Sequence, residues 1–140
     1  MSRVVDASVV VAALIDAGPV GRWAESMLSG DDLCAPHLMP VEVANVLRRN
    51  EDAATISSDA ASLAHVDLAD RAISLYPYQP LARRIWELRS NITCYDAWYV
   101  ALAESLGSTL ATLDVRLAKA TGTRCDFETP PVETPPGARS

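Results

Sequence analysis

The chain has 140 residues, of which 49% are hydrophobic, and a formal net charge of −6 at pH 7. A chain of this length and apolar content predicts one globular domain with a substantial buried core. The negative charge argues against a protein that coats nucleic acid by general electrostatic attraction, but it leaves open an enzyme that acts on nucleic acid through a metal ion.

The first elements of the chain alternate between strand and helix patterns. A valine-rich run over residues 2–6 predicts a short buried strand that ends at Asp6. The next elements in chain order are a helix over 8–16, a helix over 19–29, a strand over 33–35 and a helix that opens at Pro40 and runs through 49. Pro40 suits a first helical turn because its missing N–H needs no partner there.

The second half of the chain continues the same alternation. We expect a helix over 57–66 rich in small residues, a strand over 72–76 that Pro77 stops, and then helix 80–89, helix 94–106, strand 109–112 and a short helix over 115–120. Gly107 is placed to cap the clearest of these helices in the left-handed conformation. The pattern is typical of an α/β domain on a parallel sheet, with three of the aromatic residues in its core: Trp86, Trp98 and Tyr99.

The ends and the cysteines add further expectations. We predict a folded domain over 1–127 and a disordered or extended tail over 128–140, where four prolines fall in a short polar stretch. The three widely spaced cysteines, Cys34, Cys94 and Cys125, fit buried free thiols in a reducing compartment. The apolar run 9–15 is too short to span a bilayer. The sequence therefore predicts a cytoplasmic protein without a membrane segment.

Four acidic residues stand where predicted strands end or predicted helices begin: Asp6, Glu42, Asp96 and Asp114. Taken singly, each could cap a helix or favour the positive end of one. In a parallel sheet, however, the carboxyl ends of the strands and the adjoining helix starts meet at one crevice. Four acids meeting there would repel one another unless a cation lay between them. Oxygen ligands completed by water suit Mg²⁺ or Mn²⁺, so we predict a divalent-metal site.

Two hydroxyl residues accompany the acids. Ser8 follows Asp6 by two positions, and Thr112 precedes Asp114 by two. We expect these hydroxyls to orient the carboxylates or to hold a metal-bound water, and local bonding to the backbone is the alternative. Several arginines could form a phosphate-binding rim, or could simply cover solvated helix faces: Arg48, Arg49, Arg83, Arg84 and Arg89.

Four segments together resemble the PIN-domain ribonucleases, and more narrowly the VapC toxins of bacterial toxin–antitoxin pairs. They are Val4-Val5-Asp6-Ala7-Ser8, Pro40-Val41-Glu42-Val43, Tyr95-Asp96-Ala97-Trp98-Tyr99-Val100-Ala101-Leu102-Ala103 and Leu110-Ala111-Thr112-Leu113-Asp114. The similarity runs in order from residue 3 to about residue 125. In the resemblance, Asp6, Glu42, Asp96 and Asp114 match the family's acidic quartet, and Ser8 and Thr112 match its accessory hydroxyls.

The resemblance implies a three-layer α/β/α fold with a central parallel sheet of four to five strands. It also implies RNA cleavage that depends on Mg²⁺ or Mn²⁺, homodimerisation and neutralisation by a VapB-type antitoxin. An apolar groove between the small-residue helix, over 53–66, and Val46-Leu47 could receive a helix of that antitoxin.

Two alternatives from other classes stay open at this point. One is a metal-dependent phosphatase with an aspartyl nucleophile, although such enzymes usually need a second acid two residues after the first, where this chain has Ser8. The other is a non-catalytic α/β binding or adaptor module that uses the four acids only as helix caps.

Overall fold

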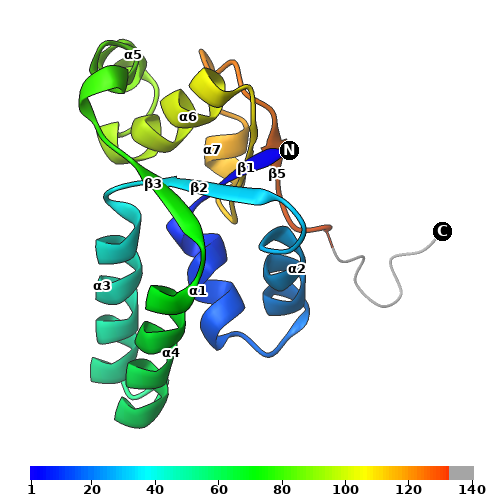
Figure 1. Cartoon of the computed structure of the whole chain (residues 1–140), viewed down its shortest axis with the longest axis vertical. Coiled ribbons are helices and arrows are strands. Elements are labelled where there is room, and N and C mark those ends of the chain that lie inside the picture. Colours follow the sequence, from blue (N-terminus) through cyan, green and yellow to red (C-terminus); the bar gives the residue numbers. More distant parts are fainter. Residues whose placement is uncertain (133–140) are drawn as a thin grey trace, which may run out of the picture.

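A computed structural model describes residues 1–132 of the chain, and over these residues five strands form one fully parallel sheet (Figure 1). The spatial order is β3-β2-β1-β4-β5, so the N-terminal strand is central. The strands are β1 (Ser2–Val5), β2 (Asp32–Pro36), β3 (Ile73–Tyr76), β4 (Thr109–Ala111) and β5 (Phe127–Glu128).

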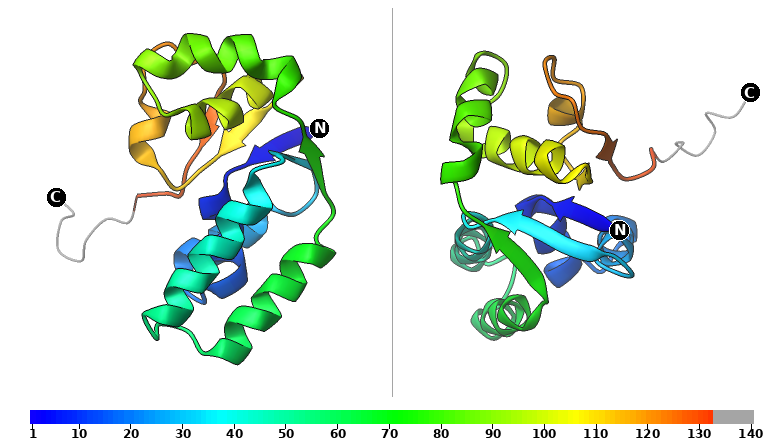
Figure 2. Two further views of the ribbon diagram at one scale, coloured as in Figure 1. Left: turned by 90° about the vertical axis from the view of Figure 1, so that its left-hand side faces the viewer. Right: turned by 45° about the horizontal axis from the view of Figure 1, so that its top comes forward.

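Helices cover both faces of this sheet, which confirms the three-layer α/β/α architecture (Figures 1 and 2). The first four helices pack on one another on one side: α1 (Ala7–Ile15), α2 (Pro19–Met27), α3 (Met39–Asp52) and α4 (Ser58–Asp70). On the other side α6 (Cys94–Leu106) packs on β1, β2 and β4, and α5 (Ala82–Glu87) packs on α6. The short α7 (Val115–Ala118) follows β4.

The local sequence explains why β1 and α6 form where they do. Val4 and Val5 are fully buried, as expected for a central parallel strand that is covered on both faces. At the start of α6 the Thr93 hydroxyl accepts a hydrogen bond from the backbone N–H of Asp96 (3.1 Å), and Gly107 ends the helix with φ 62°. Both elements therefore bring an acid to the carboxyl edge of the sheet.

The segment predicted as one helix over 80–89 differs from expectation. It is broken into a 3-10 turn (Gln79–Leu81), the six-residue α5 and a second 3-10 turn (Leu88–Ser90). Ile85 and Leu88 are buried, but Trp86 is 58% exposed, so its assignment to the core is wrong. The neighbour of a buried residue points about 100° away around a helix, and Trp86 instead lies under the guanidinium of Arg89.

The cysteines follow the prediction only in part. All three are free thiols, and Cys34 is buried. Cys125 is half-buried, and Cys94, the first residue of α6, is exposed. The expectation of a buried thiol is therefore wrong for Cys94, because the first residue of this capped helix faces outward at the edge of the sheet.

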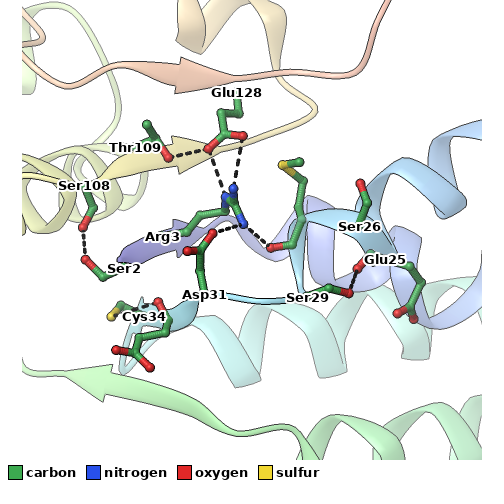
Figure 3. Close-up of polar contacts among 12 residues, drawn as sticks. Ser2, Arg3, Glu25, Ser26, Ser29, Asp31, Cys34, Ser108, Thr109 and Glu128 are labelled. Atoms are coloured by element: carbon green, nitrogen blue, oxygen red, sulfur yellow. Dashed lines mark hydrogen bonds and ion pairs between the residues drawn. The ribbon is translucent and has the colours of Figure 1, made fainter.

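The sheet extends to Glu128 through a strand that the sequence analysis did not identify as an element. Figure 3 shows how Arg3 of β1 holds this strand: its Nε donates to Glu128 Oε1 at 3.0 Å. The same guanidinium lies 2.9 Å from Asp31 Oδ2 and donates to the Met27 carbonyl at 2.9 Å. The predicted tail over 128–140 falls largely outside the described residues, which end at 132. Within residues 1–132 no helix combines the length and the apolar character needed to cross a membrane.

Candidate active site

Asp6 follows β1 directly and stands beside β4, whose Ala111 carbonyl accepts the Asp6 backbone N–H at 3.0 Å. Its side chain does not cap α1. Instead Asp6 Oδ2 accepts hydrogen bonds from the hydroxyls of Thr112 (2.7 Å) and Ser8 (3.0 Å). Thr112 is fully buried, and the two hydroxyls together fix the orientation of the carboxylate. These are the two hydroxyl residues that the sequence placed next to the acids.

Glu42 lies in the first turn of α3 and is half-buried. Its Oε1 accepts a 2.6 Å hydrogen bond from the hydroxyl of Tyr99, a residue of α6 that is only 1% exposed. Burial, then the hydrogen bond to Glu42, raises the pKa of the Tyr99 phenol above its ordinary value, so this group acts as a neutral donor. The sequence pattern predicts Tyr99 only as a core residue, because its contact with Glu42 depends on how α3 and α6 pack in the folded chain.

Asp96 and Asp114 enter from α6 and from the start of α7. Asp96 donates its backbone N–H to the Thr93 hydroxyl, as in a capping box, but among residues 1–132 no backbone N–H donates back to the Asp96 carboxylate. Asp114 does cap α7: its Oδ1 accepts the backbone N–H groups of Arg116 (2.9 Å) and Leu117 (3.2 Å). The capping interpretation is therefore correct for Asp114, and both of its cap bonds use the same oxygen.

The charges of the four acids affect the pKa values of their neighbours in the group. Burial raises the pKa of Asp6, Glu42 and Asp96 above their ordinary values, against the opposing effect of their hydrogen bonds. The negative charge of Asp114 raises the pKa of Asp6 and of Asp96, and Asp6 and Asp96 both raise that of Glu42. Glu42 and Asp96 are each affected by two of the other acids and Asp6 by one, and in every case the neighbouring negative charge disfavours the ionised form.

The donor set fits a hard divalent cation, since it offers only carboxylate and hydroxyl oxygens. Over the described part of the chain, no three acidic side chains already stand in a geometry that would hold one ion. Mg²⁺, however, usually keeps several waters and is bound through one or two carboxylates. Two of these acids bound directly to the ion, with the others bonded to its water ligands, would meet that requirement.

A cleft of about 770 Å³ opens beside the acids and has Asp96 and Asp114 in its walls. Of the five arginines proposed as a rim, only Arg89 lines it. Arg84 is instead bound to Glu104 (2.6 Å), and Arg48 pairs with Asp52 along α3. Arg116, which the sequence analysis did not single out, also lines the cleft. Its position two residues after Asp114 is the sequence feature that could have identified it.

These features define the class of the protein. The family model of the PIN domain matches residues 3–122, and the chain belongs to this family. Among curated relatives, ribonuclease VapC9 of Mycobacterium tuberculosis is 37% identical over 128 residues, which cover 91% of this chain and 98% of the relative. Ribonuclease VapC1 of the same species is 40% identical over 126 residues, or 89% of this chain and 95% of the relative.

Solved structures agree on the fold. The crystal structure of VapC20 from M. tuberculosis, a toxin that cleaves the sarcin–ricin loop, superposes with a TM-score of 0.64 at 18% identity, covering 87% of this chain and 96% of that one. The VapBC2 complex of Rickettsia felis bound to a DNA fragment from its promoter gives a TM-score of 0.65 at 12% identity, covering 92% and 98%. The predicted PIN-like fold is confirmed.

Proposed function

We propose that this chain is a toxin ribonuclease that hydrolyses RNA phosphodiester bonds with Mg²⁺ or Mn²⁺ and is neutralised by a VapB-type antitoxin. The observation that carries the proposal is the position of Asp6, Glu42, Asp96 and Asp114 at strand ends and helix starts of a PIN-domain sheet, where their charges raise the pKa values of neighbouring acids in the group. The names of the relatives, all VapC ribonucleases over nearly their full length, support the same function. They favour it over the phosphatase and over the adaptor module.

The residues take the following roles in this proposal. Asp6, Asp96 and Asp114, with Glu42, hold the cation, while Ser8 and Thr112 fix the Asp6 carboxylate through its Oδ2. When bound, a divalent cation supplies a water of lowered pKa and offsets charge on the phosphate oxygens. The products that the family resemblance implies are a 5′-phosphate and a 3′-hydroxyl.

Cleavage of RNA by the purified chain is expected to require Mn²⁺ or Mg²⁺ and to stop in EDTA. Asp96→Asn should lower the rate about a hundredfold or more, because a metal contributes several kcal/mol and each 1.4 kcal/mol or so is a factor of ten. Asp59→Asn, a first-turn acid of α4 that is exposed, is the matched control and should cleave normally. Cleavage that persists at the wild-type rate in Asp96→Asn would contradict the proposed site.

Removal of one hydroxyl tests how Glu42 is positioned. Tyr99→Phe deletes the 2.6 Å bond to Glu42, and we expect about a tenfold loss of Mn²⁺ affinity, at the lower end of the effect seen for partners of metal ligands. Isothermal titration with Mn²⁺ measures this directly. Tyr95→Phe, on the same helix but 64% exposed, should bind Mn²⁺ like the wild type. Equal affinities for both variants would show that the hydroxyl of Tyr99 does not support the site.

The antitoxin site proposed with this function is the groove between α3 and α4. This groove, of about 390 Å³, has apolar and polar residues in equal number in its lining: Ala44, Leu47, Ala61 and Val66 beside Arg48, Glu51, Ser62 and His65. Val66 is 54% exposed. An amphipathic helix places its apolar face into such a groove. The proposal also includes a homodimer in the cytoplasm, and sedimentation equilibrium checks the oligomeric state.

A charge placed in this groove is expected to release the toxin from its antitoxin. Val66→Asp should abolish inhibition of RNA cleavage by the cognate antitoxin while the cleavage rate stays unchanged, because the groove is separate from the acids. Leu63→Asp introduces the same charge one turn away, at a position that does not line the groove, and should remain inhibited. Inhibition that survives in Val66→Asp would place the antitoxin elsewhere.

A further inference from the structure

We propose that the cleft beside the acidic cluster binds single-stranded RNA next to the scissile phosphate, with Arg89 and Arg116 contacting the RNA phosphates. This inference rests on the proposed ribonuclease function and adds to it the path of the substrate and the residues that hold it.

The position of the cleft is the first argument. One wall comes from the segment 89–93 and the start of α6, and the other comes from α7 and the turn that follows it. Asp96 belongs to the first wall and Asp114 to the second. A strand that occupies the cleft therefore passes directly between two of the four acids that form the candidate site.

The charge of the two arginines is the second argument. The chain carries a net charge of −6, and four of its arginines (Arg3, Arg48, Arg71 and Arg84) form ion pairs with acids. Within residues 1–132 the other arginines form none, and of these only Arg89 and Arg116 line the cleft, although Asp114 is only two residues from Arg116. The Asp114 carboxylate bonds the backbone N–H of Arg116 and not its guanidinium. Two exposed cations at the edge of an acidic crevice lack an anionic partner, and phosphates supply one.

The support of Arg89 is the third argument. Its guanidinium lies 4.3 Å from the centroid of the Trp86 ring, and Nη1 donates to the Trp86 carbonyl at 2.6 Å. These contacts hold the planar group before any ligand arrives, which lowers the cost of ordering it on binding. These contacts with Arg89 also give a role to the Trp86 side chain, which is 58% exposed.

Single-stranded RNA suits this surface better than a duplex. Unpaired nucleotides offer both phosphates and free base edges, and proteins contact them by stacking on arginine or aromatic planes and by hydrogen bonds. Beside the two arginines, the cleft presents neutral polar side chains for such bonds: Ser90, Asn91, Thr93 and Thr121. A duplex keeps its bases stacked inside and would use only the phosphate contacts.

The test is steady-state cleavage of a fluorescent single-stranded oligoribonucleotide that carries a mapped cut site. Arg89→Ala and Arg116→Ala should each lower kcat/KM about tenfold, mainly by raising KM, since each removes a charge-assisted hydrogen bond. Each should also reduce the slope of log(kcat/KM) against log[salt] by about 0.7, the value for one phosphate contact on a single strand. Arg89→Lys keeps the charge without the planar stack and should lie between wild type and alanine.

The controls separate binding from folding and from metal binding. Arg22→Ala removes an exposed arginine of α2, on the opposite face of the sheet, and should change neither kcat/KM nor the slope. Mn²⁺ affinity and thermal unfolding should stay at wild-type values in both cleft variants, and Arg89→Gln and Arg116→Gln replace any alanine variant that unfolds. The same sequence annealed into a duplex should be cleaved more slowly than the single strand.

Three results would overturn the inference or its basis, and they are distinguishable. Wild-type protein that cleaves no RNA would remove the proposed function itself. Normal cleavage with unchanged kcat/KM and salt slope in both arginine variants would overturn the cleft assignment alone. If those variants cleave normally but escape inhibition by the antitoxin, the cleft binds a protein partner and not RNA.

Discussion

Replacing Asp6 by asparagine is expected to abolish RNA cleavage and, at the same time, to stabilise the metal-free protein at neutral pH. Asparagine keeps a carbonyl oxygen that can accept the hydrogen bonds of Ser8 and Thr112, so the local geometry is preserved. It removes the negative charge that the cation needs. The loss of rate should be about a hundredfold or more.

The gain in stability follows from the direction of the Asp6 pKa. Burial raises this pKa above 3.8 in the folded protein, and Asp114 adds to the effect. An acid with a raised folded pKa binds its proton more tightly when folded, so it favours folding at low pH. That contribution is lost as pH rises from about 3.8 through the raised pKa, and at neutral pH the charged, crowded carboxylate opposes folding.

Thermal or urea unfolding in EDTA across pH 4 to 8, roughly the range in which carboxylates with raised pKa titrate, measures both effects. Wild-type stability should fall as pH rises, and Asp6→Asn should flatten part of that fall. Glu42 and Asp96, whose pKa values are also raised, should account for the remainder. Added Mn²⁺ should stabilise the wild type at neutral pH through preferential binding to the folded state, and should stabilise the variant much less.

The control for this prediction is Asp59→Asn, which removes an exposed acid and should leave the pH profile, the Mn²⁺ response and the cleavage rate unchanged. A variant Asp6→Asn that cleaves like the wild type would refute the role of Asp6. A variant that loses activity and is also less stable in EDTA would show a structural defect and not a missing ligand.

The prediction that the four acids meet at one crevice depends on topology alone. Asp6 directly follows β1, which is central in the observed strand order, and α6 starts after its cap Thr93 and ends at Gly107. In a parallel sheet these points share one edge. The sequence does not determine whether an acid caps a helix or faces the crevice, because a residue at the start of a helix can do either. Asp114 caps α7, whereas Asp6 caps nothing.

The cleft and the Tyr99 contact depend on tertiary packing that spacing does not report. Tyr99 has the sequence position of a core residue and is buried as one, yet its hydroxyl reaches Glu42, which is 57 residues away. Trp86 also has the position of a core residue, but within α5 it points about 100° away from the buried Ile85 and is exposed. A hydrophobic pattern of one or two turns does not determine which of two adjacent apolar residues is buried.

The last strand was missed for a related reason. Phe127–Glu128 is too short to carry a periodic signal, and the prolines that follow suggest a tail. Its place in the sheet is determined by distant groups: Arg3 and Thr109 both donate to the Glu128 carboxylate, at 3.0 Å and 2.5 Å. Figure 3 shows Arg3 between β5, Asp31 and the end of α2. This arginine therefore joins three segments that are far apart in the sequence.

Arg3→Ala is expected to cost about 2 kcal/mol of unfolding free energy, measured by urea denaturation at pH 7. Loss of one partner from a buried ion pair costs roughly 3–5 kcal/mol, and the side chains of Arg3, Asp31 and Glu128 are partly exposed, at 14%, 26% and 29%, which reduces that figure. Arg48→Ala breaks the exposed pair with Asp52, whose members are 60% and 66% exposed, and should change stability by less than about 0.5 kcal/mol.

The pH dependence of the unfolding free energy tests the contact between Arg3 and Glu128 independently. Burial disfavours the charge on Glu128, but the hydrogen bonds from Arg3 and Thr109 outweigh it and hold the pKa below 4.5. An acid with a lowered folded pKa stabilises the fold above its unfolded pKa, and that stability is lost as pH falls from 4.5 through the lowered value. The difference between wild type and Arg3→Ala should therefore shrink under acid. A difference that stays constant to low pH would mean that Arg3 acts through packing and not through Glu128.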